Sequence, residues 1–444
     1  MRRECDFRST VAGPAVTTGR WRHRVRAICH NFWQNDSDDR RSLPAANRFA
    51  QARAILSASD RSAGTQAKAV PMKILHVYKV YLPENFTGVP RVIHSICEGA
   101  ARLGVESSVL ALSPEAHDGP VRIGAHDVHL VRRDLHLAST GLSLAVFARF
   151  RELALGADLV HYHLPWPVAD LLYLRSGQRK PSVVTYHSDV VRQKLMLPLY
   201  RPILHRLLSG VDAVVATSSN YAATSLELAR HPSKVSVIPI GIPEAGPVDG
   251  ALREAWRERL GSDFFLFVGA HRYYKGLDFL VEASRLCGLP VVVAGGADTR
   301  ALTGNDCPPN LRFVGEVSEA DKEALLSLSK AFVLPSHLRA EAFGVALLEA
   351  ARRGKPMISC EIGTGTTYVN IGGVTGLAVP PADAEALAMA MKLLDGDREL
   401  ANRMGRAARS RYEELFRDDV MASAYLDLYQ RVLGSKPNQG IEAL

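Results

Sequence analysis

Short apolar runs alternate with longer amphipathic stretches over most of this chain. From Met72 onward, an apolar run that fits a buried strand is followed by a stretch whose apolar residues recur at helical spacing, and the order then repeats. Such alternation is typical of a mainly parallel sheet with helices on both faces. The pattern therefore predicts an α/β protein with doubly wound sheets.

The alternating elements fall into two sets, separated by a linker-like segment rich in proline and glycine at Pro239–Pro247. The first set predicts strands at Ile74–Tyr78, Ser108–Leu112, Leu159–Tyr162, Ser182–Tyr186, Ala213–Ala216 and Val235–Pro239. Its predicted helices include Val89–Arg102, Leu142–Leu155 and Tyr200–Leu208. The second set predicts strands at Phe264–Val268, Val291–Ala294, Arg312–Val314, Phe332–Leu334, Met357–Ser359 and Leu377–Val379.

From about Asp383 the pattern is helical as far as Gly434. The chain is therefore predicted to have four parts. Two Rossmann-like domains are predicted at 72–243 and 244–415, with ligands in a cleft at the carboxyl ends of their strands. Residues 416–444 are predicted to form a helix and tail that pack back on the amino-terminal domain. Residues 1–71 are predicted to be a disordered basic extension.

The charge of the chain is concentrated in that extension. The net charge is +8, but residues 1–71 hold 13 Lys+Arg against 6 Asp+Glu, which leaves 41 against 40 for the rest. A nearly neutral body does not favour a nucleic-acid binder. A disordered extension or an upstream start codon is favoured over a targeting presequence or a contact with anionic lipid.

Cysteine and histidine usage indicates the compartment and argues against a metal site. The six cysteines show no C-x-x-C pair, so we expect reduced thiols and a cytoplasmic protein. No apolar run approaches the ~20 residues that a membrane-spanning helix needs. His161 and His163 have strand spacing and share one face, where a core or acceptor-cleft position is favoured over a metal pair.

Two carboxylates, Glu341 and Glu349, flank the start of a predicted helix just after a buried strand. Phe343-Gly344 opens that helix, and the strand before it ends at Pro335. Free amides at a helix start suit phosphate oxygens, and a carboxylate accepts hydrogen bonds from sugar hydroxyls. This arrangement predicts a site for a sugar that bears a phosphate.

A second group of residues follows another predicted strand, Phe264–Gly269. Lys275-Gly276 comes shortly after it and supplies a cation for the same diphosphate. The Asp395-Gly-Asp397 triplet has the spacing of a metal-binding motif, but it lies between two predicted helices and is interpreted as a solvated turn. The site is therefore predicted without a metal or another cofactor.

The chain resembles the retaining glycosyltransferases of family four in these motifs and in their order. Those enzymes have the two-domain GT-B fold. The resemblance covers residues 72 to about 435. It rests on the Glu341–Glu349 pair, Pro335-Ser336, Val268-Gly269 with Lys275-Gly276, Thr87-Gly88-Val89 and Thr185–Asp189. Leu75–Pro83, His161–Pro167 and Cys360–Tyr368 are most similar to bacterial O-polysaccharide transferases that use GDP-mannose or GDP-D-rhamnose.

The resemblance implies roles for individual residues of the donor side. Glu341 would accept hydrogen bonds from donor-sugar hydroxyls, with Ser336 before it. The amides of Phe343 and Gly344 would hold the sugar and the diphosphate, and Glu349 would bind the ribose.

Further residues are implied around the leaving group, the base and the sugar. Lys275 would neutralise the diphosphate, Glu316 lies in the turn where such enzymes seat the base, and His187 would stand beside the sugar from the other domain. Gly88 would let the first loop approach the phosphate closely. The family usually has an arginine where this chain has Ala270, and Arg272 could reach the same phosphate instead.

The resemblance implies a mannosyl- or rhamnosyltransferase that acts on a lipid-linked or polysaccharide acceptor in O-antigen or surface-glycan assembly. A sucrose- or trehalose-type synthase and a non-catalytic sugar-nucleotide binder remain alternatives. Residues 191–208 mix cations with large apolar residues, which predicts peripheral contact with an anionic membrane on its cytoplasmic face or, equally, a core helix with a basic exposed side.

Overall fold

The computed structural model describes residues 71–86, 88–115, 117, 119–137, 140–175, 180–189, 197–296, 302–304 and 306–434. All of these belong to one compact unit, Val70–Leu444. The predicted extension up to residue 70, Thr87 and the tail beyond Gly434 lie outside the described residues. In the ranges given above, no helix combines the length and the apolar character needed to cross a membrane.

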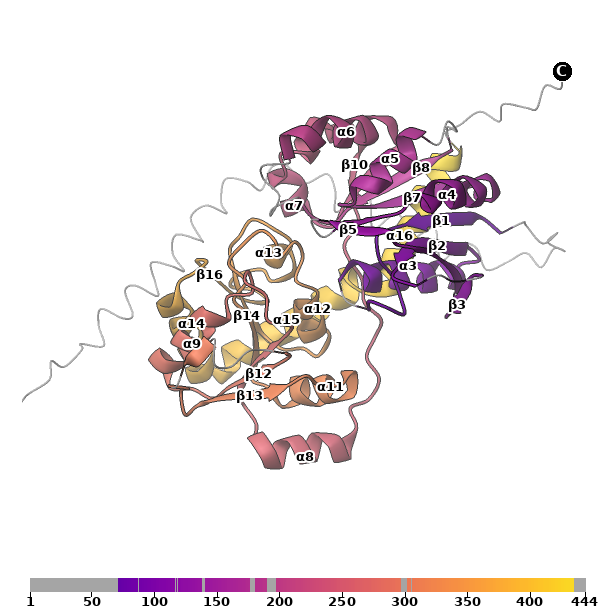
Figure 1. The fold of residues 1–444 in the computed structure, drawn as a ribbon. Helices are drawn as coiled ribbons and strands as arrows, with labels where there is room; N and C mark the ends of the chain where they lie inside the picture. The colour runs from indigo at the N-terminus through magenta and orange to yellow at the C-terminus, as the bar shows by residue number, and fades with distance from the viewer. Residues whose placement is uncertain are drawn as a thin grey trace, which may run out of the picture. The chain divides into compact units, whose positions relative to one another are not determined.

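The first domain is built on an eight-stranded sheet in the order β10-β9-β8-β7-β1-β2-β4-β3 (Figure 1). Its strands are parallel except for β3, which pairs antiparallel with β4. The strands are β1 Lys73–Val77, β2 Glu106–Ser113, β3 Val121–Ile123, β4 His126–Arg132, β7 Leu159–Leu164, β8 Ser182–Tyr186, β9 Ala213–Ala216 and β10 Val235–Val237. Every residue of β8 is buried, as expected for a parallel strand covered on both faces.

Helices connect these strands, with a small hairpin before the second helix. The helices are α3 Val89–Arg102, α4 Ala145–Gly156, α5 Pro167–Arg175, α6 Leu197–Gly210 and α7 Ser219–Thr224, followed by the short turns η1 Leu228–Arg230 and η2 Pro232–Lys234. The hairpin pairs β5 Leu135–Leu137 with β6 Thr140–Leu142. The prediction that a helix starts at Leu142 was wrong because Leu142 pairs with Leu135 in this hairpin.

The second domain carries a six-stranded, fully parallel sheet in the order β13-β12-β11-β14-β15-β16. Its strands are β11 Phe265–Val268, β12 Val291–Ala294, β13 Leu311–Gly315, β14 Ala331–Leu334, β15 Met357–Cys360 and β16 Gly376–Val379. Its helices are α8 Gly250–Leu260, α9 Leu277–Cys287, α11 Glu319–Leu328, α12 Val345–Arg352, α13 Thr366–Val369 and α14 Ala384–Gly396. The predicted α/β class, with two doubly wound parallel-sheet domains, is confirmed.

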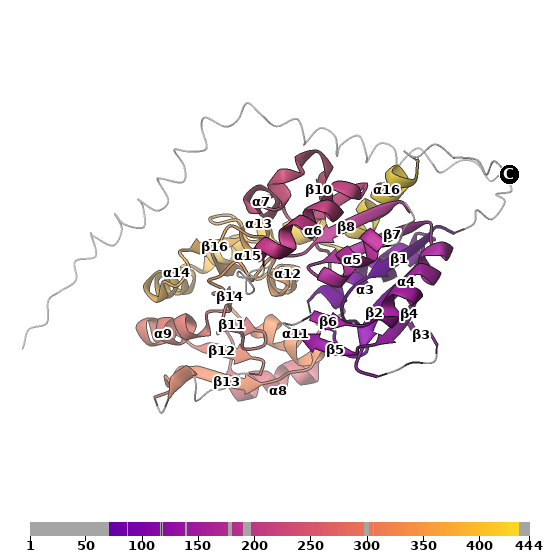
Figure 2. The same cartoon turned by 45° about the horizontal axis from the view of Figure 1, so that its top comes forward.

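Two chain segments run side by side where the domains are connected. The linker residue Ile242 donates from its backbone amide to the carbonyl of Phe416 at 2.9 Å. Phe416 stands between α15 (Arg398–Leu415) and α16 (Asp418–Gly434), which are yellow in Figure 2. The strand before the linker ends at Val237 rather than at the predicted Pro239, because proline has no amide to donate to a strand neighbour.

The last helix, α16, lies against α3 of the first domain. Arg102 of α3 forms an ion pair with Asp418 at 2.6 Å. A side chain at Gly99 would start only 2.6 Å from Ala422, so a glycine is what allows the two helices to approach so closely. The carboxyl-terminal helix is therefore part of the first domain's packing.

Candidate active site

Lys275, Glu341 and Ser336 meet at the carboxyl ends of β11 and β14. The Lys275 ammonium lies 2.5 Å from Oε2 of Glu341, and the Ser336 hydroxyl donates to the same oxygen at 3.1 Å. Burial alone would lower the pKa of Lys275, but the negative charge of Glu341 outweighs it and the pKa is raised. The structure therefore presents a lysine cation and a carboxylate in direct contact.

Gly276 explains why these two loops come so close. Its φ is +70°, and an added Cβ would lie 2.1 Å from the carbonyl oxygen of Pro335. Only glycine fits both the left-handed backbone and this close approach. The loop after β11 therefore lies directly on the loop after β14, which brings Lys275 to Glu341.

The start of α12 offers backbone donors beside this cluster. Gly344 caps the helix with a φ of +84°, and the buried ring of Phe343 packs edge-on against Phe416. Among the described residues, the amides of Phe343 and Gly344 have no backbone acceptor. Open amides at a helix start favour an anion, and the predicted binding of a phosphate here stays a prediction.

Glu349 lies one helix turn further along α12 and is buried with two cations. Its Oε1 accepts from Lys322 of α11 at 2.8 Å and from Arg91 of α3 at 3.0 Å. Arg91 also lies 3.5 Å from Glu319. The predicted ribose-binding carboxylate is thus in contact with a side chain from the other domain.

Arg272 and Glu316 occupy exposed loops at the same edge of the second sheet. Arg272 lies between β11 and α9, and Glu316 directly follows β13. Both residues are exposed. Their predicted roles toward a phosphate and the nucleotide base stay predictions, and both side chains are accessible to a ligand.

His187 stands at the carboxyl end of β8 and is linked to further buried histidines. Its Nε2 lies 3.0 Å from Nδ1 of His163, whose Nε2 lies 3.1 Å from Nδ1 of His76. His161, the other member of the predicted pair, lies beside His163 with tilted rings whose centroids are 4.2 Å apart. Burial lowers the pKa of His187 to about 3, so the ring is neutral at physiological pH.

Tyrosines of α16 complete this histidine network. His161 hydrogen-bonds to the Tyr429 hydroxyl at 2.8 Å and to Thr185 at 2.7 Å, while Thr185 also contacts Tyr425 at 2.9 Å. Nitrogen atoms of His76, His161 and His163 lie within 4.8 Å of one another. A metal would have to displace these hydrogen bonds, so the geometry favours a neutral hydrogen-bonded network.

Gly88 is the N-cap of α3 and has a φ of +64°. A side chain there would meet no described atom within 4 Å, so the space beside this glycine is open. The glycine therefore allows the turn into α3, and its predicted role beside the phosphate stays a prediction.

A second contact joins the domains near His187 and Glu341. Arg339 lies between β14 and α12 and pairs with Asp189, which follows β8, at 3.3 Å. The Thr224 hydroxyl donates to the Gly363 carbonyl at 2.7 Å. The loops that follow β8 and β14 therefore contact each other where the two domains meet.

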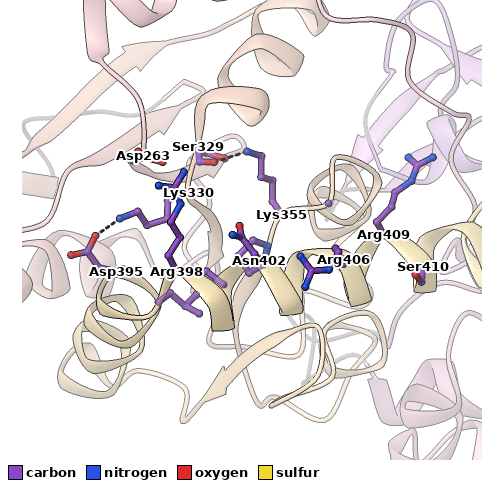
Figure 3. A pocket seen from close by; sticks show the side chains of 14 residues that line it. Asp263, Ser329, Lys330, Lys355, Asp395, Arg398, Asn402, Arg406, Arg409 and Ser410 are labelled. Atoms are coloured by element: carbon purple, nitrogen blue, oxygen red, sulfur yellow. Dashed lines mark hydrogen bonds and ion pairs between the residues drawn. The ribbon is translucent and has the colours of Figure 1, made fainter.

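Two cavities lie at the amino-terminal edges of the sheets, opposite the predicted site. A cavity of about 680 Å³ in the second domain is lined by Asp263, Lys330 and Lys355, which precede β11, β14 and β15 (Figure 3). Lys330 forms an ion pair with Asp395 in this cavity. Asp395 belongs to the triplet that was predicted to be a solvated turn. The other cavity, of about 770 Å³, includes Lys73 at the start of β1. None of the predicted site residues lines either cavity.

Three charged residues were not predicted: Arg91 and Lys322, which contact Glu349, and Arg339, which contacts Asp189. Their partners lie elsewhere in the sequence: the residue numbers differ by 258 for Arg91 and Glu349, by 150 for Arg339 and Asp189, and by 27 for Lys322 and Glu349. Lys322 is 5% exposed, although it follows a capping box that indicates an ordinary surface helix. No local pattern distinguishes these residues from solvated charges.

Comparison with known proteins supports the resemblance noted above. Residues 86–245 match the family described as Glycosyltransferase Family 4, and residues 249–411 match Glycosyl transferases group 1. The D-rhamnosyltransferase WbpZ of Pseudomonas aeruginosa is 50% identical over 78% of this chain and 92% of its own length. The O-antigen chain mannosyltransferase C of Escherichia coli is 42% identical over 82% of this chain and 100% of its own length.

Solved structures agree with the fold at much lower sequence identity. A sucrose-phosphate synthase from Thermosynechococcus elongatus superposes with a TM-score of 0.68 at 20% identity, covering 82% of this chain and 100% of that one. HepE of Anabaena in complex with UDP and glucose gives a TM-score of 0.64 at 16% identity, covering 81% and 99%. These likenesses show the GT-B fold.

Proposed function

Since this chain belongs to glycosyltransferase family 4, we propose that it transfers mannose or D-rhamnose from a GDP-sugar with retention of anomeric configuration. The family membership makes the protein a glycosyltransferase with a sugar-nucleotide donor and a glycan acceptor. The acceptor that we propose is a lipid-linked or polysaccharide glycan in the assembly of O-antigen or a related surface glycan. The names of the two relatives support this choice of sugar and pathway.

One observation carries the proposal at the level of the site. Lys275 contacts Glu341 beside open helix amides, and Arg339 brings this group to the domain that holds His187. A cation and amides suit the diphosphate of a donor, while a carboxylate suits the hydroxyls of its sugar. The proposed donor site therefore combines both kinds of group where the loops after β11 and β14 meet.

The chemistry follows from where charge develops. Breaking the bond between sugar and diphosphate leaves negative charge on the diphosphate and positive character on the sugar ring. Lys275 and the amides of Phe343 and Gly344 would stabilise the departing diphosphate, and Glu341 would orient the sugar through its hydroxyls. Gly276 allows the close approach of the two loops that brings Lys275 and Glu341 together before any donor binds.

His187 would act as a neutral hydrogen-bonding group beside the sugar. Its low pKa of about 3 makes it a poor source of positive charge at pH 7. Its hydrogen bond to His163 fixes the orientation of the ring. We therefore assign it a role in positioning the donor sugar or the acceptor, with Gly88 leaving room for the phosphate.

The acceptor side includes a proposed contact with an anionic membrane. Residues 191–196 of the proposed contact segment lie outside the described residues, and the remainder forms part of α6. Leu204 and Leu207 of α6 are buried, whereas Leu199 is 81% exposed and Arg206 is exposed. An exposed leucine and arginine on one helix support contact with anionic lipid. Co-sedimentation with anionic but not neutral vesicles is expected, and equal binding to both would contradict it.

The small-sugar synthase is the less supported alternative. The likeness to sucrose-phosphate synthase rests on 20% identity and concerns the fold alone. The two relatives at 50% and 42% identity are named for transfer of D-rhamnose and mannose. A sugar-nucleotide binder without activity is likewise less supported, because both relatives are named as transferases.

A donor panel tests the proposed function. The purified protein is incubated with GDP-mannose, GDP-D-rhamnose or UDP-glucose, either alone, with a lipid-linked glycan or with a small sugar phosphate, and nucleotide release is measured. We expect turnover with a GDP-sugar only when the acceptor is present, and NMR should show an α-linked product. Turnover of UDP-glucose with a small sugar phosphate, or GDP binding without consumption of any donor, would contradict the proposal.

A further inference from the structure

The segment 339–349 is tied to the first domain at both of its ends. At one end, Arg339 pairs with Asp189 at 3.3 Å. At the other end, Glu349 accepts from Arg91 at 3.0 Å. Between these contacts lie Glu341 and the open amides at the start of α12, which are the groups proposed to bind the donor.

The contact at Glu349 leaves one carboxylate oxygen available. Lys322 and Arg91 both donate to Oε1, and no described residue donates to Oε2. A carboxylate held through one oxygen is oriented so that the other can accept from a ligand hydroxyl. Arg91 therefore helps to fix the direction of the acceptor atom that the proposed ribose needs.

Charge balance gives Arg91 a second effect. Arg91 and Lys322 carry two positive charges, and Glu319 and Glu349 carry two negative charges within the same cluster. Loss of Arg91 would leave one uncompensated negative charge close to the site of a negatively charged diphosphate. Like charges repel more strongly in a partly buried site than in water, so donor binding should weaken.

The contact at Arg339 is built into the first domain. Its guanidinium lies over the Tyr221 ring at 5.3 Å and donates to the Thr224 hydroxyl at 3.0 Å. Asp189 is held independently by Ser225 at 2.7 Å. Removing Arg339 would therefore release the segment without leaving Asp189 unpaired.

From these contacts we propose that Arg91 and Arg339 are positioning residues that couple donor binding to the approach of the two domains. The inference rests on the proposed function, because it takes the segment 339–349 as the donor site. Arg91 would act mainly on donor affinity through Glu349. Arg339 would act mainly on turnover, because it aligns Glu341 with the first domain that brings the acceptor.

The test compares Arg91→Ala, Arg91→Lys and Arg339→Ala with a matched control. Arg102→Ala is the control because Arg102 lies on α3 like Arg91 and forms an ion pair, but with Asp418 of α16. Donor KM and kcat are measured by GDP release, and thermal midpoints are measured on the same preparations.

We expect Arg91→Ala to raise the donor KM by about 10- to 100-fold, the range for loss of a charged hydrogen bond. Arg91→Lys should recover part of this loss because the charge remains while the fork between Glu319 and Glu349 is lost. Arg339→Ala should lower kcat by roughly ten-fold with a smaller effect on KM. Arg102→Ala should change both constants by less than about two-fold, as is usual for an exposed ion pair.

The combination of Arg91→Ala with Glu349→Gln sharpens the test. If Arg91 acts through Glu349, the double variant should bind donor about as weakly as the worse single variant. The inference would be overturned if Arg91→Ala and Arg339→Ala behaved like Arg102→Ala. It would also be overturned if their losses followed a fall in thermal midpoint. If the unmodified protein consumed no GDP-sugar, the proposed function itself would fail.

Discussion

The carboxyl edge of the first sheet carries neutral imidazoles, whereas the carboxyl edge of the second carries opposite charges in contact. His187 and His163 are buried, with pKa values lowered by burial, and hydrogen-bond to one another. Lys275 is also largely buried, yet its pKa is raised because Glu341 lies beside it. Similar burial therefore produces neutral groups in one domain and retained charges in the other.

This difference matches the two halves of a glycosyl transfer. Charge develops on the diphosphate, so the donor side needs groups that stay ionised. A sugar hydroxyl is neutral and is positioned by hydrogen bonds, which neutral histidines supply. The contrast between the two edges suggests that charge stabilisation belongs to the second domain and orientation to both.

The largest expected effect comes from removing the charge of Glu341. Glu341→Gln keeps the shape but loses the charged contact with Lys275 and the strong acceptor for sugar hydroxyls. We expect kcat to fall by about 100- to 1000-fold, the typical cost of losing one preorganised polar group. Glu258→Gln on the exposed face of α8 is the control. Near-normal turnover of Glu341→Gln would show that the charge of Glu341 does not contribute to the reaction.

The next effect tests how the two loops are brought together. Gly276→Ala would force a Cβ to 2.1 Å from the carbonyl oxygen of Pro335. Gly288→Ala is a matched control, since its φ is +69° against +70° and its Cβ would meet no described atom within 4 Å.

Both alanine variants should lose about 1 kcal/mol from the positive φ. Gly276→Ala should lose about 1–3 kcal/mol more from overpacking, together with most of its turnover. Urea unfolding and GDP release measure the two effects. Equal stability and equal activity of the variants would show that the close approach does not position Lys275.

The buried neutral histidines of the first domain predict that the folded protein loses stability in acid. Burial lowers the pKa values of His76 and His187 to about 3, against 6.5 in the unfolded chain. Between these values the unfolded chain binds protons that the folded chain does not, so stability falls as the pH drops below 6.5. At pH 5 the cost is on the order of 2 kcal/mol for each of these histidines.

Urea unfolding at pH 7.5 and pH 5.0 measures this dependence. His76→Gln should reduce the difference between the two pH values, whereas His117→Gln, an exposed residue outside the network, should not. Identical pH dependence in both variants would show that His76 is not a buried neutral histidine.

The smallest expected effect is that of metal removal. Lys275 and the α12 amides are proposed to supply the positive character that the diphosphate needs. Treatment with EDTA should therefore change turnover by no more than roughly two-fold. Loss of activity on chelation, with recovery on adding Mg²⁺ or Mn²⁺, would contradict this prediction. It would show that a metal ion supplies part of the positive charge proposed for Lys275.

The second sheet could be predicted closely from the sequence, and the first less so. Parallel strands buried on both faces appear as continuous apolar runs, so all six strands of the second sheet were located. In the first domain, β3 and β4 escaped prediction. β4 contains His126, which counts as polar in the pattern but is fully buried through contacts with Tyr81 and Glu98.

The site could be predicted as far as local patterns reach. Lys275 and Glu341 were singled out because each follows a strand, Ser336 was implied by the resemblance, and the structure joins the three through hydrogen bonds. The contacts of Arg91 and Arg339 could not be predicted, because they depend on how the two domains meet. The predicted domain boundaries and the individual ligand-binding roles stay predictions.

The structure of the protein with bound GDP tests the central claim most directly. We expect the diphosphate to contact Lys275 and the amides of Phe343 and Gly344, with the ribose at Oε2 of Glu349. Binding of GDP elsewhere, such as in the basic cavity beside Lys355, with the Lys275–Glu341 pair untouched, would contradict it.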